Sequence, residues 1–244
     1  MADFVQEDSF STLGKPKLHS ALGQRAYDHI KLRLLEGDLE PEDKLSVVAL
    51  TTDLGCSRAP VMEALKRLES EGFVEIIPQV GCKVVSPAAR DVTDFFVLFS
   101  KVEGTIAKFA SERRTRDDLA TFRTVCIHID EMVMAAGMPA AHDPNYRRLN
   151  LLFHTHIHKM ARSPLASGIA AGLWDRSDFY IKMAFGSLYF SSRVKRSHRA
   201  IRKAIINGDS DVAEQEVGMH LCAVGESVVQ NLEETVNASG VLYS

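Results

Sequence analysis

The stretch from Leu45 to Gly72 constrains the fold more than any other part of this sequence. Ser46 is suited to cap a short helix that ends at Gly55, where a left-handed residue costs least. Ser57 is then a good N-cap for a second helix, which runs up to the stop at Gly72. A helix, a tight glycine turn and a capped helix are typical of a helix-turn-helix. The sequence therefore predicts this motif between residues 45 and 72.

The flanking segments extend the motif to a whole domain. Apolar residues recur at helical spacing over residues 21–35, before the motif. After it, residues 73–77 and 83–85 are β-prone runs separated by a proline- and glycine-containing turn, which predicts a small β-hairpin, the wing. We therefore expect a winged helix-turn-helix domain over residues 19–86, preceded by a flexible arm over residues 1–18.

The rest of the chain shows helical periods and no alternating strand pattern. We expect an all-α antiparallel bundle of about six helices over residues 87–236, followed by a tail over residues 237–244. The predicted fold class is mainly α, with ligand sites expected between facing helices of the bundle. The expected helices lie near residues 95–109, 119–133, 145–161, 165–185, 188–207 and 210–233.

Length and composition agree with two ordinary globular domains. The chain has 244 residues, of which 45% are hydrophobic and 25% are charged, so a disordered or collagen-like chain is excluded. Its four cysteines lie far apart and form no C-x-x-C pair, which argues against disulfides and thiolate zinc sites and favours the reducing cytoplasm. No targeting segment or apolar run of membrane-spanning length is visible, so no membrane partner is expected.

Net charge gives no sign of a nucleic-acid partner. Lys and Arg together number 29, against 32 for Asp and Glu. Any binding to DNA phosphates must therefore come from a local basic face. The second helix of the motif offers such a face, because its apolar stripe points inward and leaves Arg58, Met62 and Lys66 in an exposed row. These charges could also be an ordinary solvated surface, but the surrounding turn, cap and wing favour DNA.

Three motifs together resemble a known family. Residues 54–72 closely resemble the recognition region of GntR-type regulators. Downstream, residues 150–154, residues 197–213 and the pair His220–Leu221 look like the ligand-binding (FCD) domain of the FadR subgroup. The resemblance covers nearly the whole chain, with the motifs in family order. It implies a transcriptional regulator that binds a near-palindromic operator as a homodimer and responds to a small-molecule effector.

The resemblance also implies which residues face double-stranded DNA, and it shows where this chain departs from the family. Val48, Met62 and Val80 stand where these regulators usually place arginine, and Ala59 replaces a common threonine. Either the operator is unusual, or affinity has shifted onto other groups, including Lys15 and Lys17 of the arm, or DNA binding has weakened or been lost. The expected DNA-binding residues are Ser57, Arg58, Ala59, Met62, Lys66, Gln79 and Lys83.

Histidines from three helices form the second candidate site. By helical spacing, His198 and His220 should point into the bundle, while His154 shares a helix face with Asn150 and His158. Each histidine alone is more simply a hydrogen-bonded core residue. The resemblance implies instead that Asn150, His154, His198 and His220 hold one divalent metal, zinc or nickel, with Asn150 replacing the family's usual Asp. His158 is the reserve ligand.

Other features are weaker. Glu103 stands where the resemblance expects a glutamate, but Phe99 occupies the place of a common arginine, so these two residues mark only a tentative effector pocket. No catalytic motif is present, and no carboxylate is placed beside the histidines as an obvious base, so no enzyme activity is expected. Trp174, Tyr180, Phe185 and Tyr189 are expected to be core or dimer packing rather than a ligand cage.

Three functional hypotheses follow from different classes. The first is a metal-dependent or metal-stabilised, ligand-responsive DNA-binding regulator. The second is a sensory metal- and ligand-binding helical protein whose operator binding is weakened or lost. The third is a helical metallo-hydrolase. We adopt the first as the working hypothesis.

Overall fold

The computed structural model describes residues 20–135, 144–186 and 192–239 of the chain. The expected arm with Lys15 and Lys17, and also Tyr189, lie outside the described residues. The chain divides into two compact units. One contains the segment up to Ala88 and a helical segment that begins at Asp175, and the other contains the remaining helices.

The first unit is a winged helix-turn-helix, as the sequence predicts. Its strands form one antiparallel sheet in the order β1-β3-β2, in which Leu45 pairs with Cys82 and Val74 with Val84. Strand β1 was not expected, because a strand of two residues is too short to show an alternating pattern. The elements are α1 (Ala21–Glu36), β1 (Lys44–Leu45), α2 (Val47–Leu54), α3 (Arg58–Ser70), β2 (Val74–Ile77) and β3 (Gly81–Val84).

Local signals fix the turn of the motif. The hydroxyl of Ser46 accepts a hydrogen bond from the backbone N–H of Ala49 at 3.2 Å, which caps α2. Gly55 ends α2 in the left-handed region, with φ 61° and ψ 35°. Ser57 precedes α3 as expected, but its side chain accepts no capping hydrogen bond from the described backbone. The unit closes around a core that includes Ile30, Leu34, Leu65, Leu68 and Phe73.

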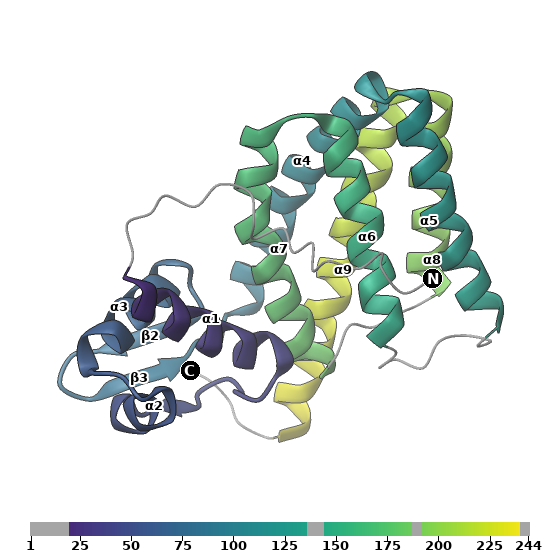
Figure 1. Cartoon of the computed structure of the whole chain (residues 1–244). Helices are drawn as coiled ribbons and strands as arrows, with labels where there is room; N and C mark the ends of the chain where they lie inside the picture. Colours follow the sequence, from purple (N-terminus) through teal and green to yellow (C-terminus); the bar gives the residue numbers. More distant parts are fainter. Residues whose placement is uncertain (1–19, 136–143, 187–191, 240–244) are drawn as a thin grey trace. The chain divides into compact units, whose positions relative to one another are not determined.

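The second unit is the expected helical bundle. Figure 1 shows its long helices lying alongside one another, and α4 packs against α6, α8 and α9. Gly104 lets α4 and α9 approach closely, because a Cβ atom there would lie 2.9 Å from the carbonyl oxygen of Glu214. The helices after the winged domain are α4 (Ala89–Arg113), α5 (Arg116–Ala135), α6 (Pro144–Ala161), α7 (Pro164–Phe185), α8 (Ser192–Asn207) and α9 (Ser210–Ser239). The part of α7 from Asp175 onward belongs to the first unit. The mainly-α class is confirmed, and none of the described helices has the length and apolar content needed to cross a bilayer.

Candidate nucleic-acid interface and metal centre

The exposed side of α3 carries the residues expected to face DNA. Its opposite side is buried through Val61, Ala64, Leu65 and Leu68, which fixes the rotation of the helix on the domain core. This rotation leaves Ser57, Arg58, Ala59 and Lys66 exposed and Met62 partly exposed. Within the described residues, Arg58 and Lys66 form no hydrogen bond or ion pair, so both cations are available to a partner.

The wing presents a different set of groups. Gln79 and Val80 lie exposed in the turn between β2 and β3, and Gln79 takes a left-handed backbone conformation with φ 64°. Lys83, on β3, is ion-paired with Glu42 at 2.9 Å and with Glu75 at 3.5 Å. Its hydrogen bond to Glu42, followed by the charges of both carboxylates, raises the pKa of Lys83. The charge of Lys83 is thus partly neutralised within the protein.

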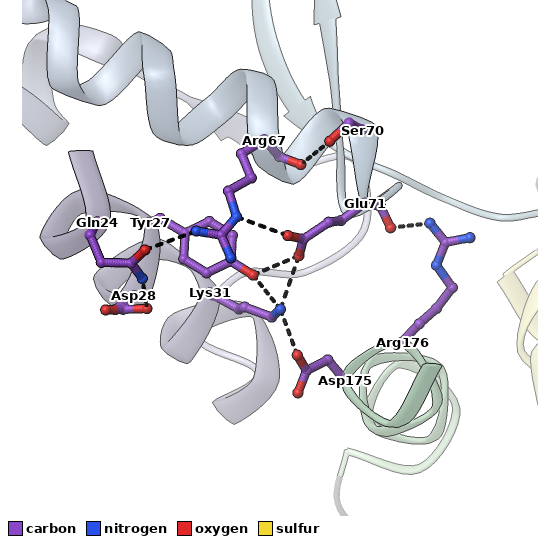
Figure 2. A network of polar contacts seen from close by, with 9 residues as sticks. All are labelled: Gln24, Tyr27, Asp28, Lys31, Arg67, Ser70, Glu71, Asp175 and Arg176. Atoms are coloured by element: carbon purple, nitrogen blue, oxygen red, sulfur yellow. Dashed lines mark hydrogen bonds and ion pairs between the residues drawn. The ribbon is translucent and has the colours of Figure 1, made fainter. Parts of the chain in front are cut away.

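A polar network fixes the C-terminal end of α3 against α1 (Figure 2). Glu71, the C-cap of α3, accepts hydrogen bonds from the phenol of Tyr27 at 2.6 Å and from the ammonium of Lys31 at 2.9 Å. Lys31 also pairs with Asp175 at 2.6 Å, and Arg67 pairs with Glu71 at 3.1 Å. Glu71 therefore pairs with both cations, and Lys31 also joins it to Asp175.

Arg67 is committed to this network. Its guanidinium lies 3.5 Å from the centre of the Tyr27 ring and donates to the side-chain oxygen of Gln24 at 3.0 Å (Figure 2). Of the basic residues on α3, Arg67 is consequently the one that structure removes from the candidate interface. Sequence spacing could not reveal this, because Tyr27 lies 40 positions and Gln24 lies 43 positions before Arg67 in the chain.

Charges within the network stabilise one another. Burial by itself would lower the pKa of Lys31, but Asp175 and Tyr27 raise it above its usual value. Burial would raise the pKa of Glu71, yet its hydrogen bonds with Tyr27 and Lys31, together with the charge of Lys31, lower it. Lys31 and Glu71 are therefore both held in their charged forms around neutral pH.

The bundle brings the three predicted histidines together. His154 on α6, His198 on α8 and His220 on α9 each offer a ring nitrogen, and these nitrogens all lie within 4.8 Å of one another. The side chains are buried, with exposures of 1%, 6% and 6%. Nδ1 of His154 and Nε2 of His198 have no hydrogen-bond partner among the described residues. Two orphaned buried nitrogens in one cluster fit a site built for a metal ion.

Burial also holds these imidazoles in the form that binds metals. Desolvation, together with the nearby charges of His198 and His220, lowers the pKa of His154 well below its usual value. Desolvation and His220 do the same to the pKa of His198, and burial lowers the pKa of His220 to about 4. The histidines are therefore neutral at pH 7, and only a neutral imidazole can coordinate a metal. Zinc and nickel both accept such a donor set.

The reserve ligand His158 takes part in a different cluster. Its Nε2 lies 2.9 Å from Oε1 of Glu103, and its Nδ1 lies 3.2 Å from the hydroxyl of Ser167. The same Glu103 oxygen accepts a hydrogen bond from the indole N–H of Trp174 at 2.8 Å. A buried carboxylate does therefore lie beside a histidine, contrary to the expectation from sequence. The two residues are 55 positions apart, so no local pattern connects them.

Aromatic rings surround the histidines. The indole of Trp174 lies 4.5 Å from the imidazole of His154, and the ring of Phe153 stacks on His198 at 4.7 Å. Phe99 is fully buried and packs edge-on against Trp174 at 5.2 Å. Trp174 thus links Phe99 and Glu103, the two residues of the tentative effector pocket, to the histidine cluster. The burial of Trp174 agrees with the predicted packing role, and its hydrogen bond to Glu103 is a contact that the sequence does not predict.

Asn150 lies on α6 one helical turn before His154 and is partly exposed. Its position on the same helix face is the expected one, since residues four apart in a helix lie above one another. Its coordination of a metal stays a prediction.

A winged helix-turn-helix is a DNA-binding fold, and together with a separate helical bundle it is typical of a two-domain transcriptional regulator. Residues 22–84 match the family model described as bacterial regulatory proteins, gntR family, and residues 94–223 match the FCD domain. The chain therefore belongs to the gntR family, among its members with an FCD domain.

The chain is similar to known proteins over most of its length. The chain is 21% identical over 208 residues to the uncharacterized HTH-type transcriptional regulator YdhC of Bacillus subtilis, covering 85% of this chain and 91% of the relative. It is 22% identical over 215 residues to the HTH-type transcriptional repressor RspR of Escherichia coli, covering 87% and 91%. The solved structure of McbR/YncC from Escherichia coli has the same fold, with a TM-score of 0.61 and 18% sequence identity. The match covers 91% of this chain and 100% of that chain.

Proposed function

We propose that this protein is a ligand-responsive regulator that binds a near-palindromic DNA operator as a homodimer, with an effector bound in the helical domain near a divalent metal. The observation that carries the DNA part is the exposed row on α3, which begins directly after the left-handed turn at Gly55. An arginine at the N-terminal end of such a helix can reach the edges of bases in the major groove. Arg58 occupies that position.

The dimer is proposed on physical grounds. One recognition helix contacts too few base pairs to find a site in a genome, and paired half-sites supply the missing specificity. A two-fold axis in the protein then requires an operator that is close to a palindrome.

The metal is proposed from the donor set. His154, His198 and His220 would supply imidazole nitrogens, and Asn150 would supply a weak carbonyl oxygen in place of a carboxylate. A bound ion would act as a Lewis acid toward an oxygen of the effector. Because Phe99 replaces the arginine seen in the family, we propose that the effector is held near Trp174 and Glu103 by hydrogen bonds and by the metal rather than by that ion pair. An effector that favours one arrangement of the dimer would change operator affinity by shifting the population of states.

One specific observation supports a second candidate, a sensor that no longer binds an operator. Val48 and Val80 stand where the family places arginine, and their side chains are 72% and 75% exposed without adding any positive charge. Fewer phosphate contacts would weaken binding to any sequence.

The experiment that separates the two candidates is a genome-wide pull-down of DNA bound by the full chain. Enrichment of one or a few sites that share a near-palindrome would support the regulator. Enrichment no greater than that of an unrelated protein, at both low and physiological salt, would support the sensor without an operator.

A further inference from the structure

We infer that this protein reads its operator largely through thymine methyl groups, so that its half-sites are rich in A·T pairs around a single guanine. The inference rests on the proposed DNA-binding function and specifies the sequence class that would be bound. In it, Arg58 reads the guanine, Ala59 and Met62 pack on thymines in the major groove, and the wing tip prefers A·T pairs in the minor groove.

The first step concerns the cations of α3. Arginine is the side chain that forks onto guanine, because its two N–H groups match the O6 and N7 acceptors. Arg67 cannot do this, since it is held by Tyr27, Gln24 and Glu71 (Figure 2). Only Arg58 remains as an arginine on this helix, with Lys66 two turns further along. Each recognition helix therefore offers one arginine for a bidentate contact with guanine.

The second step concerns the apolar part of the same surface. Ala59 is exposed and Met62 is partly exposed, and they lie three residues apart on the side of α3 opposite the core. Neither side chain can hydrogen-bond to the two acceptors and the amino donor that G·C and A·T pairs both carry in the major groove. On a G·C pair an apolar side chain would therefore leave polar atoms without partners and find no apolar group to contact. A T·A pair adds the thymine methyl group, and contact with it removes apolar surface from water.

The third step concerns the wing and rests on different residues from those of α3. Its exposed tip carries Gln79 and Val80, while the nearby cation Lys83 is paired with Glu42 and Glu75. In the minor groove, A·T pairs offer only acceptors, which suit the amide N–H of glutamine. A G·C pair adds the amino group of guanine, which would lie against an apolar side chain such as Val80. Both parts of the interface thus favour A·T pairs.

The exposure of the apolar residues agrees with a contact role. Among the described residues 20–88, Val48 and Val80 are the most exposed large hydrophobic side chains, at 72% and 75%. Val48 lies in the first turn of α2, the first helix of the helix-turn-helix motif. Leu32, on α1 in the same domain, is also exposed, at 54%, but lies outside the motif and the wing, and it serves below as a control.

The test is a selection of duplexes from a random library by the full-length protein, followed by atomic changes to the selected site. Each thymine is replaced in turn by deoxyuridine, which removes the methyl group and keeps every hydrogen bond. We expect the dissociation constant to rise about fourfold for each contacted methyl group. Replacing a contacted T·A pair by C·G should weaken binding more than replacing it by 5-methylcytosine·G, which restores the methyl group.

Variants then connect the effect to residues. Met62→Ala should lose the sensitivity to deoxyuridine at its own thymine and keep it elsewhere, whereas Leu32→Ala should leave every sensitivity unchanged. A selected site that is bound equally well with thymine and with deoxyuridine, or that has G·C pairs at the positions opposite Met62, would overturn this inference and leave the proposed function intact. Failure to select any duplex would instead reject the proposed function, and the inference with it.

Discussion

The indole of Trp174 packs on the imidazole of His154, with ring centroids 4.5 Å apart. Trp174 is the single tryptophan of the chain, so the tryptophan fluorescence comes from one side chain beside the histidine cluster. Adding nickel or zinc to protein purified without an affinity tag should change this fluorescence until about one ion per chain is bound. A titration that also follows metal content would measure both the fluorescence change and the number of ions bound per chain.

The matched variants for this titration are His198→Ala with His220→Ala, and His128→Ala as the control. The double variant should lose the saturable response, because one remaining imidazole cannot hold the ion. His128 is exposed on α5, so its replacement should leave the titration unchanged. Equal metal uptake by the double variant and the parent would show that the three histidines are packed core residues and no metal site.

Acid should destabilise the metal-free protein. Burial lowers the pKa of His220 to about 4, while an unfolded histidine titrates near 6.5. The unfolded chain therefore binds the proton first, and stability is lost as the pH falls from about 6.5 to about 4, by roughly 3 kcal/mol for this group. Below the folded-state pKa this group adds no further loss. Urea unfolding at several pH values would measure the trend, which a His220→Gln variant should show more weakly than a His128→Gln variant.

The network around Lys31 should stabilise the winged domain. Replacing Lys31 by Met removes the ammonium that Glu71 and Asp175 share and leaves both carboxylates partly buried. Because these side chains keep some contact with water, we expect a loss of about 1–3 kcal/mol, below that of a fully buried pair. Hydrogen exchange of the amides in α1 and α3 would measure it. As a control, Arg90→Met removes an exposed partner of Asp94 and should change stability by less than about 0.5 kcal/mol; an equal effect of the two variants would contradict the prediction.

The left-handed turn at Gly55 should not tolerate a side chain. Gly55→Ala places a Cβ atom at φ 61° and should cost about 1–2 kcal/mol, although nothing in the structure lies within 4 Å to clash with it. Gly168→Ala is the matched control, since this glycine lies inside α7 with the same open surroundings. That change should be neutral or stabilising by up to about 1 kcal/mol. Thermal unfolding of both variants would measure the loss of stability. A loss in Gly55→Ala only would show that the backbone conformation, and not the loss of a glycine as such, causes it.

Arg58 should carry base recognition. Arg58→Ala should weaken binding to the selected operator by about 1–3 kcal/mol, whereas Arg33→Ala removes the same charge from α1 and should change it little. Met62→Arg should make the dependence of affinity on salt steeper by about one unit of slope. Fluorescence anisotropy at several salt concentrations would measure each value, and unchanged operator binding by Arg58→Ala would show that α3 is not the recognition helix.

Much of this molecule could be predicted locally. The limits of α2 follow from its cap Ser46 and from Gly55, and Gly37 ends α1, because these signals act within a few residues. Ser57 marks the start of α3 although its side chain makes no capping hydrogen bond. The inward direction of His154, His198 and His220 also follows from helical spacing, and their burial confirms it. The family of the chain was likewise visible in its motifs.

What only the tertiary structure decided is which side chains meet across long stretches of sequence. His154 and His158 share one face of α6, yet one faces His198 and His220, and the other pairs with Glu103. One helical turn along the axis is enough to give each a different set of neighbours, and those neighbours are set by how the helices pack. The commitment of Arg67 to Tyr27 and the extra strand β1 depend on packing in the same way. The sequence thus determined the elements and the faces they bury, because propensity and periodicity are local, and the packing of those faces determined the contacts.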